Sequence, residues 1–442
     1  MALDRRALLR DLYEEAVRAA HPADCLRTHL PPAPSDGRLV IVGAGKAAGA
    51  MAVAAERHYL EAGVIGQVSG CLTPPYGYTA SLGEEIPEHL SLAEARHPTP
   101  DSASEEAAGR AHAFAVSARE NDLLLVLLSG GASSLWAAPA GIDLATKTAL
   151  TRGLLKSGAD IHEMNAVRRH LSRIKGGRLA AAGGRAGRIL TLAISDVPGD
   201  DPETIGSGPT VPDPTSLADA RAILERLGPR MEALGLSVSE AVRQALDDPG
   251  NETPKPGDPI FARSEYRIVA TPRMALDRAA ALAREKGYRV IDLGDGVTGE
   301  AREVAAEHAR MALEARQRGE RVAIISGGEL EVTVRNRDGR GGRSQEYALA
   351  LALAIDGVPQ VAAIAADTDG IDGGDGEITD PAGAIVDGGT VAAGQARHMD
   401  AAKSLDNNDA TPYFEGIDAL VMRGPTHTNV NDFRAILVDP DA

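Results

Sequence analysis

The chain has 442 residues, of which 43% are hydrophobic and 25% charged, and its formal net charge is −17. This length favours two domains over a single core, and the composition is typical of a globular protein. The acidic balance argues against nucleic acid or an anionic membrane as a partner. No apolar run approaches the length of a membrane span.

Two features of the sequence predict a cytoplasmic enzyme. The only cysteines are Cys25 and Cys71, which suits a reducing compartment and gives no zinc spacing. The N-terminal segment MALDRRALLRDLYEEAVRAA carries acids at helical intervals and lacks an apolar signal region, so we interpret it as a first helix. We expect a monomer or a homodimer.

From Leu39 onward, short apolar strands alternate with longer helical stretches, which predicts parallel sheets. The Pro- and Gly-rich segment 247–259 is the best linker candidate. We therefore expect an N-terminal domain over 1–246 with a Rossmann-like doubly wound sheet, and a C-terminal α/β domain over 260–442. In the second domain we expect strands at RIVA, YRVIDLG, RVAIISGG, EVTVRN, QVAAIAADTDG and AILV.

The segment VIVGAGKAAG fits the pattern G-x-G-x-x-A after a strand, with Gly43, Gly45 and Ala48. Such a turn binds a phosphate or carboxylate at the helix N-terminus, or it serves only as a tight turn. A dinucleotide site also needs an acid at the end of the next strand, which here ends in Thr, Pro and Pro. NAD is therefore disfavoured, and Lys46 inside the turn is the more informative residue.

Two apolar strands run into Ser-Gly-Gly. The first is LLSGGASSL, whose candidate anion-binding residues are Ser129, Gly130, Gly131 and Ser133. The second is IISGGE, where Glu329 follows the glycines and Arg343 lies further on in a Gly-rich loop before a helix. The fork-shaped guanidinium suits a carboxylate or a transferring phosphate.

Several other polar residues follow strands or glycines. Lys175, in RIKGGRLA, fits either a solvated helix end or an oxyanion site. Asp196 ends a buried strand and suits Mg²⁺ binding or proton transfer, while Asp367 and Asp369 are the acids nearest another strand end and suit Mg²⁺. Asn429 lies in GPTHTNVND, which we interpret as a loop network that lines a site.

Taken together, these motifs resemble the class II glycerate 2-kinases, which carry an N-terminal glycerate kinase domain and a C-terminal MOFRL domain. The matches, in order, are GAGKAA, LLSGGASSL, LSRIKGGRLA, ISDVPGDDPETIGSGPT, ISGGE, GGRSQE, DTDGIDG and GPTHTNVND. Two positions depart from the family pattern: Ser344 stands where Asn is usual, and His427 where Gly is usual.

The resemblance implies ATP-dependent phosphorylation of D-glycerate to 2-phosphoglycerate with a divalent metal, in an active-site cleft between two α/β domains. It places the MOFRL region at about 320–440 and implies Lys46 and Arg343 as active-site residues. We expect these two cations to neutralise glycerate and γ-phosphate charge, while Asp196 or Asp367 binds Mg²⁺ or accepts the 2-hydroxyl proton. Members of the family have also been labelled hydroxypyruvate reductases, so an NAD(P)H-dependent 2-hydroxy-acid reductase is the alternative.

Overall fold

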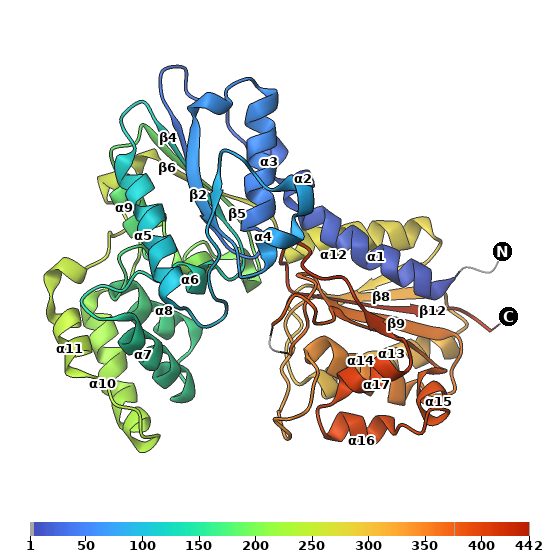
Figure 1. The fold of residues 1–442 in the computed structure, drawn as a ribbon. Helices are drawn as coiled ribbons and strands as arrows, with labels where there is room; N and C mark the ends of the chain where they lie inside the picture. The colour runs from blue at the N-terminus through green and yellow to red at the C-terminus, as the bar shows by residue number, and fades with distance from the viewer. Residues whose placement is uncertain (1–3, 375, 442) are drawn as a thin grey trace. The chain divides into compact units, whose positions relative to one another are not determined.

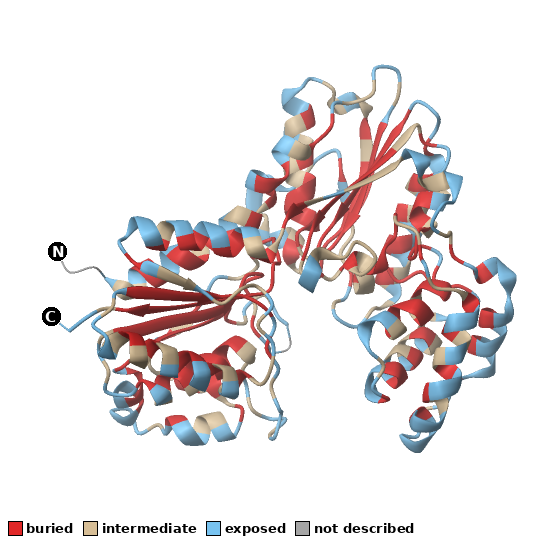
Figure 2. Cartoon of the chain, turned by 180° about the vertical axis from the view of Figure 1, so that it is seen from behind, coloured by how far each residue is buried: buried red, intermediate tan, exposed pale blue. Residues whose placement is uncertain are grey.

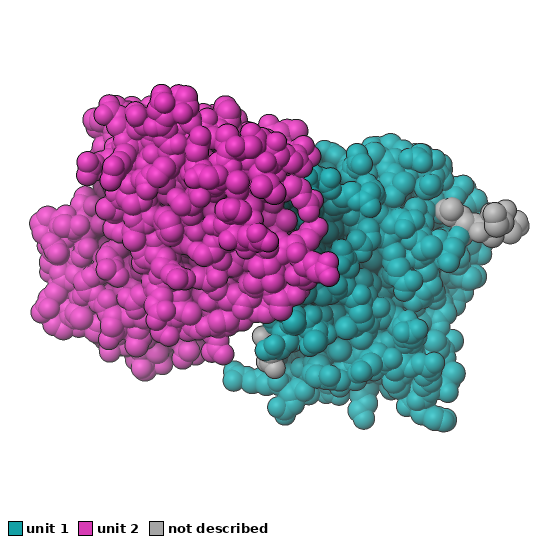
Figure 3. All heavy atoms as spheres, turned by 45° about the horizontal axis from the view of Figure 1, so that its top comes forward, with its two compact units in different colours: residues 1–24, 270–442 teal, residues 25–269 magenta. Residues whose placement is uncertain are grey.

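The computed structural model describes residues 4–374 and 376–441, which form two compact units (Figures 1 and 3). Unit 2 is Cys25–Val269, and unit 1 combines Met1–Asp24 with Ala270–Ala442. Each unit contains one six-stranded sheet with helices packed on it, so the expectation of two α/β domains is confirmed. No helix among the described residues is long and apolar enough to cross a membrane.

The helices of the chain lie between and around the strands of these two sheets. Their bounds are α1 Arg5–Ala20, α2 Pro22–Cys25, α3 Ala48–Glu61, α4 Tyr78–Ser81, α5 Ser102–Ser117, α6 Ala132–Leu135, α7 Leu144–Lys156, α8 Ile161–His170, α9 Arg178–Ala182, α10 Leu217–Ala233, α11 Glu240–Asp247, α12 Pro272–Glu285, α13 Ala301–Gln317, α14 Arg343–Ala354, α15 Thr390–Gln395, α16 Ala401–Asp406 and α17 Ala410–Gly416.

The sheet of unit 2 has the strand order β3-β2-β1-β4-β5-β6, which is the order of a Rossmann fold. β1 pairs in parallel with β2 and β4, β2 with β3, and β4 with β5. The strands are β1 Leu39–Ala44, β2 Val68–Thr73, β3 Ser91–Leu92, β4 Leu123–Leu128, β5 Arg188–Ile194 and β6 Ser264–Ala270. β1 and β4 are buried throughout, which explains their uninterrupted apolar sequences.

Helices cover the sheet of unit 2 on both sides (Figure 1). α5 and α9 pack against alternate residues of β1 and β4 in one hydrophobic cluster, while α3 lies on the other side. The carboxyl ends of the adjacent strands β1 and β4 therefore meet at one edge of the sheet, where α3 and α6 begin.

The sheet of unit 1 is mixed, with the order β11-β10-β9-β12-β8-β7. β7 pairs in parallel with β8, whereas the pairs β8–β12, β12–β9, β9–β10 and β10–β11 are antiparallel. The strands are β7 Arg289–Asp292, β8 Val322–Ser326, β9 Val361–Asp367, β10 Gly383–Asp387, β11 Leu420–Val421 and β12 Asp432–Val438.

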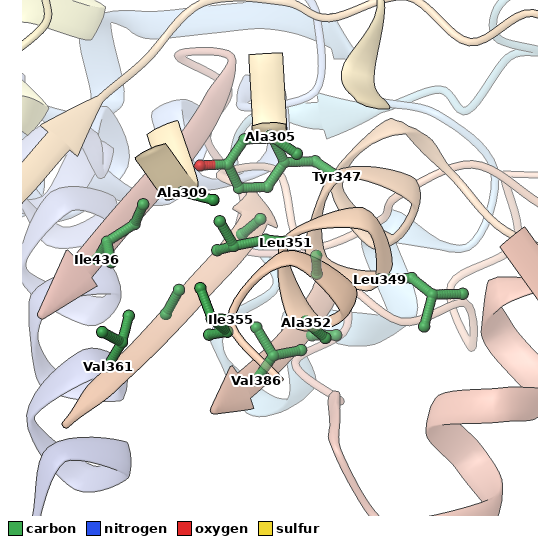
Figure 4. Close-up of a cluster of buried hydrophobic side chains, with 14 of the residues drawn as sticks. Ala305, Ala309, Tyr347, Leu349, Leu351, Ala352, Ile355, Val361, Val386 and Ile436 are labelled. Carbon is green, nitrogen blue, oxygen red and sulfur yellow. The ribbon is translucent and has the colours of Figure 1, made fainter. Parts of the chain in front are cut away.

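The core of unit 1 is made of small and branched side chains, as the low aromatic content predicts. Ala305 and Ala309 of α13 and Leu351 of α14 pack against Ile436 of β12 and other strand residues (Figure 4). α1 and α12 pack on the other side of this sheet, and Figure 2 shows the strands buried between the two helical layers. Burial on both faces explains why alternation is absent from β9 and β12.

The bounds of the compact units differ from the expected domain boundaries. α1 packs on α12, and the Tyr13 hydroxyl donates to the carbonyl of Asp367 at 2.9 Å, so the first helix belongs to unit 1. The expected linker 247–259 is packed into unit 2, where Asn251 and Thr253 are buried. The strand expected at RIVA is part of β6 and pairs in the first sheet.

One expected strand is missing from the second sheet. Within 331–336, Glu331 makes only an isolated bridge to Glu300, and the residues that follow are described as non-strand. The backbone N–H groups of Thr333 and Arg335 donate to side chains of Glu300 and Asn408 instead of to a neighbouring strand. Side-chain acceptors therefore replace a ladder that the alternating sequence predicts.

Candidate functional sites

The turn after β1 in unit 2 is held by the end of β2 and by the residues that follow β4. The N–H of Gly45 donates to Thr73 O at 3.2 Å, that of Lys46 to Gly130 O at 2.8 Å, and that of Ala47 to Ser129 Oγ at 2.9 Å. Gly45 has φ 135°, and a Cβ there would lie 2.0 Å from Ser129 Oγ. The first glycine turn therefore uses its donors within the protein, and its glycines allow close approach of the strand ends.

The Ser-Gly-Gly turn after β4 differs from the turn after β1 in its backbone N–H groups. Among the described residues, the N–H groups of Gly130 and Gly131 have no hydrogen-bond acceptor. Gly131 has φ 84°, and a Cβ there would lie 2.9 Å from His97 Cδ2, so the imidazole lies against this turn. Burial, with a smaller contribution from nearby Lys46, lowers the pKa of His97 to about 3, so His97 is neutral at pH 7.

Lys175 reaches the same turn from the segment before α9. Its Nζ donates to Ser133 O at 2.6 Å and to Ser133 Oγ at 3.0 Å, and the side chain is almost fully buried. Arg168 of α8 donates to Ser133 Oγ at 2.5 Å, and Ser207 Oγ lies 2.8 Å from it. The structure thus brings together Lys46, the Ser129–Ser133 turn and Lys175 at the carboxyl ends of β1 and β4.

Asp196 lies two residues beyond the end of β5, the strand next to β4. It is half-buried, and its charge adds to burial in raising the pKa of Tyr266 on β6. This carboxylate therefore lies on the β5–β6 side of the same sheet edge as the basic turn.

In unit 1, Arg343 at the start of α14 is paired with three carboxylates. Its Nε donates to Asp432 Oδ1 at 2.8 Å, its Nη2 to Asp367 Oδ2 at 2.8 Å, and its Nη1 to Glu329 Oε1 at 2.9 Å. Asp432 and Asp367 are buried, whereas the Glu329 side chain is 58% exposed. Glu329 is therefore the partner that an incoming anion can replace at the lowest desolvation cost.

A second arginine and a capping carboxylate complete this cluster. Arg434 Nη1 lies 3.1 Å from Asp432 Oδ2, and its remaining donors reach Ser326 Oγ and Gly327 O. Asp372 accepts from the N–H groups of Ser344 and Gln345 at 3.0 and 2.8 Å, so a carboxylate already occupies the N-terminus of α14. Burial raises the pKa of Asp372 to about 7, and nearby Asp432 adds to the shift.

Asp369 and Asn429 lie in loops that are tied to each other beside Asp367. Thr368 Oγ1 donates to Asn431 O at 2.6 Å and accepts from the N–H of Val430 at 2.9 Å. Asn429 Oδ1 accepts from the N–H of Asn431 at 3.2 Å. The predicted residues Glu329, Arg343, Asp367, Asp369 and Asn429 thus gather at one end of the sheet of unit 1.

The described acidic residues near the strand ends form no dense cluster of metal ligands. No group of three or more His, Cys, Asp or Glu side chains within the described ranges is placed to hold a metal ion. Mg²⁺ in phosphoryl-transfer sites is commonly held through one or two carboxylates and the phosphates of the substrate. Asp367 and Asp369, two buried carboxylates at the end of β9, fit that kind of site.

A cavity of about 410 Å³ is lined in part by Arg343. Leu330, Val332 and Val334 form an apolar part of its wall, and the backbone of Gly341 and Gly342 forms another part. The exposed side chain of Val334 therefore borders a hollow large enough for part of a small-molecule substrate.

The two departures from the family pattern are both buried. His427 has φ 58°, a left-handed conformation that favours glycine, which explains why glycine is usual at this position. The Ser344 side chain is fully buried, and its Oγ has no hydrogen-bond partner in the described part of the chain. An asparagine there has a longer reach and more donors and acceptors.

Sequence reasoning missed several residues of these sites. Arg168 is one of several basic residues on α8, and nothing in its spacing distinguishes it from a solvated arginine. Asp432 falls in the segment that was interpreted as a loop network, although it is buried and bonded to α14. Asp372 lies in a Gly-rich stretch of sequence and is likewise buried and bonded to α14. Arg434, another buried residue of the unit 1 site, carries no motif at all.

Comparisons with known proteins agree with this architecture. A family model described as "Domain of unknown function (DUF4147)" matches residues 8–247, and the MOFRL family model matches residues 322–432. A putative hydroxypyruvate reductase of Agrobacterium vitis is 44% identical and covers 98% of this chain and 94% of its own. The D-glycerate 2-kinase of Thermotoga maritima is 36% identical and covers 96% of this chain and 95% of its own.

The fold is likewise that of a solved glycerate kinase. A crystal structure of glycerate kinase from Thermotoga maritima superposes with a TM-score of 0.83 and 35% identity, covering 98% of this chain and 99% of that one. The fold and these matches define a two-unit α/β enzyme of the kinase class. The chain belongs to the class II glycerate 2-kinase family, as its motifs indicated.

Proposed function

We propose that this protein transfers the terminal phosphoryl group of ATP to the 2-hydroxyl of D-glycerate, giving 2-phosphoglycerate and ADP. Membership of the family and the named activity of the Thermotoga maritima relative support this reaction. The reaction runs in the cytoplasm, and the enzyme acts as a monomer or homodimer.

The contrast in charge between the two sites carries the proposal. In unit 2, Lys46, Lys175 and the open N–H groups of Gly130 and Gly131 surround one turn. In unit 1, carboxylates outnumber the arginines around Arg343. Phosphoryl transfer requires cations and N–H donors for the phosphates, and carboxylates for the metal and the hydroxyl proton.

Individual roles follow from this division. Lys46 and the Ser129–Ser133 turn bind an anionic group, and Gly43 and Gly45 give that turn its shape. Arg343 contacts a second anionic group after Glu329 releases Nη1, and Asn429 donates from its side-chain amide. Asp196 or Asp367 accepts the 2-hydroxyl proton.

Mg²⁺ would be held by Asp196 in unit 2, or by Asp367 and Asp369 in unit 1, together with the phosphates of the nucleotide. When bound, the ion neutralises phosphate charge. Asp367 also forms an ion pair with Arg343, and this pair holds the carboxylate in position.

The reductase alternative has one observation in its favour, the name of the Agrobacterium vitis relative. The end of β2 argues against it. Thr73 closes the strand, its Oγ1 accepts from Trp136 Nε1 at 3.2 Å, and Pro74 and Pro75 follow. An acid for the ribose of a nicotinamide nucleotide is therefore missing from this position in unit 2.

One set of assays separates these activities. Purified protein is incubated with ATP and D-glycerate, with and without Mg²⁺, and ADP release is followed by a coupled assay. We expect turnover only with Mg²⁺, and a product that enolase accepts directly, which identifies the 2-phosphate. NADH oxidation with hydroxypyruvate in the absence of ATP, with no ADP release from glycerate, contradicts the proposal.

A further inference from the structure

Three basic side chains of unit 2, those of Lys147, Arg168 and Lys175, lie near the Gly130–Ser133 turn and have no carboxylate partner among the described residues. Lys147 Nζ donates to Leu171 O at 2.6 Å, and the acceptors of Lys175 Nζ are O and Oγ of Ser133. Arg168 donates to Asn165 Oδ1 at 3.4 Å and to Ser133 Oγ. For the residues that the structure describes, none of these three cations has a carboxylate within 4.0 Å.

Arg169, the residue after Arg168, does have carboxylate partners. Its Nη1 lies 3.0 Å from Oδ1 of the fully buried Asp213 and 3.8 Å from Glu203 Oε2. The same helix thus carries one arginine with carboxylate partners and, one residue earlier, an arginine without any.

Burying unpaired cations is costly, because the charged form loses water and gains no counter-charge. Lys147 is only 6% exposed and Lys175 only 1%. Burial lowers the pKa of Lys147 to about 7 and lowers the pKa of Lys175 well below its usual value, and in both cases repulsion from Arg168 adds to the shift. Burial, with a smaller contribution from Arg169, lowers the pKa of Arg168 to about 10. Each of these effects is relieved when an anion joins the cluster.

Hydrogen-bond donors also lie at the Gly130–Ser133 turn. The N–H groups of Gly130 and Gly131 have no acceptor within the described ranges, and Arg168 and Ser133 are only half-buried. Ser207, whose hydroxyl lies 2.8 Å from Ser133 Oγ, has φ 62° between two glycines that are also left-handed. A non-glycine residue held in this conformation inside the fold is a feature of ligand sites.

We propose that the Gly130–Ser133 turn, Arg168, Lys147 and Lys175 form a built site for a phosphate-type dianion in unit 2. Arg168 and the two glycine N–H groups contact the anion. Lys147 and Lys175 are sealed from solvent, so they act as positioning residues that supply counter-charge. A carboxylate supplies a single charge against three cations, whereas a phosphate supplies up to two charges and three acceptor oxygens.

The proposed function enters only in naming the source of the phosphate, which is either the nucleotide or the phosphorylated product. The experiment therefore measures binding without turnover. Inorganic phosphate is titrated into the full chain by calorimetry and by thermal melting, for the wild type, Arg168→Met and Lys147→Met. Arg185→Met is the matched control, because Arg185 is an exposed arginine of the same unit without an ion pair among the described residues.

We expect saturable phosphate binding in the wild type and in Arg185→Met, and affinity at least tenfold weaker in Arg168→Met. Lys147→Met should bind phosphate several-fold more weakly while its Tm without phosphate does not fall, because the variant removes an unpaired buried charge. If Lys147 had a purely structural role, Lys147→Met would instead have a lower Tm and an unchanged affinity for phosphate. Unchanged affinity in Arg168→Met, or no saturable binding in the wild type, overturns the proposal.

Competition then identifies the source. Displacement of phosphate by ADP but not by 2-phosphoglycerate assigns the site to the nucleotide, and the reverse assigns it to the product. If phosphate binds and neither compound competes, the link between this site and the reaction is overturned. Absence of glycerate phosphorylation contradicts the proposed function alone, because the phosphate titration does not depend on it.

Discussion

Arg343 Nε lies 2.8 Å from Oδ1 of Asp432, a carboxylate that is fully buried in the sheet of unit 1. The two residues are 89 positions apart, at the start of α14 and the start of β12. Asp432 raises the pKa of Arg343, as do Asp367 and Glu329, although burial acts in the opposite direction. The arginine is therefore part of the unit's structure as well as a candidate substrate-binding group.

Replacing Arg343 by methionine should destabilise unit 1. The change leaves Asp432 and Asp367 buried with less counter-charge, and breaking such a pair from one side costs about 3–5 kcal/mol. We expect a lower free energy of unfolding by denaturant titration, together with loss of glycerate phosphorylation. The three ion pairs are the reason to expect a loss of stability together with the loss of turnover.

The control for this prediction is Arg397→Met, because Arg397 is exposed and makes no ion pair in the part of unit 1 that is described. Its stability should stay within about 0.5 kcal/mol of the wild type. Equal stability of Arg343→Met and Arg397→Met would show that the ion pairs of Arg343 contribute nothing to the fold.

Lys46→Ala should separate activity from stability. Lys46 is half-buried in a turn that is held by its own backbone N–H and by those of Gly45 and Ala47, so the side chain is not needed to close the turn. Loss of a cation that stabilises transferring charge typically lowers turnover by about 10²–10³-fold. We expect that loss in the ATP and D-glycerate assay with nearly unchanged Tm, and partial recovery in Lys46→Arg. Near-normal turnover of Lys46→Ala would remove this residue from the site.

The sequence predicted the strands well where burial forces an apolar run. β1, β4, β8 and β9 were all expected, because central strands of a sheet covered on both faces carry uninterrupted apolar residues. The segment 331–336 was not predicted correctly. Its alternating pattern suits a strand, but side-chain acceptors on Glu300 and Asn408 take its N–H groups.

The glycine motifs were located correctly from sequence, but their hydrogen bonds were not predictable. Gly45 packs against Ser129 Oγ, 84 residues away, so the role of the first turn depends on a contact between distant segments. Lys147 lies in a helix with an ordinary amphipathic pattern, yet its side chain is buried and its amine donates to the backbone carbonyl of Leu171, 24 residues further along the chain. The excess of positive charge arises because Lys147, Arg168 and Lys175 are brought together by the fold. No local sequence pattern therefore predicts it.

Asp372→Asn should change the pH dependence of stability. Burial raises the pKa of Asp372 to about 7 from its usual 3.8, so between these two pH values the folded state binds more protons than the unfolded state. The contribution of Asp372 to stability is therefore fully present below about pH 4 and is lost as pH rises towards 7. The variant keeps an acceptor for the N–H groups of Ser344 and Gln345 without a charge, so its stability relative to the wild type should rise from pH 4 to 7.

Asp372→Ala provides the matched comparison. It removes the charge and also the acceptor for two backbone N–H groups at the start of α14. Its free energy of unfolding should be lower than that of Asp372→Asn by about 1 kcal/mol at every pH. A constant difference between Asp372→Asn and the wild type from pH 4 to 7 would refute the raised pKa.

Lys147→Met should show the opposite trend with pH. Burial first, and then repulsion from Arg168, Arg178 and Arg173, lowers the pKa of Lys147 to about 7, while Glu105 acts weakly the other way. Between pH 7 and the usual lysine pKa of 10.5, the unfolded state binds more protons than the folded state. This lysine therefore makes the stability of the wild type rise by about 1.4 kcal/mol per pH unit in that range. Methionine cannot titrate, so the stability advantage of the variant over the wild type should be largest at pH 7 and smaller at pH 9.

Denaturant titrations at both pH values measure this difference. Lys156→Met, at the exposed end of the same helix, is the control and should have the same pH dependence as the wild type. An advantage that does not change with pH would mean that Lys147 keeps its proton in the folded protein.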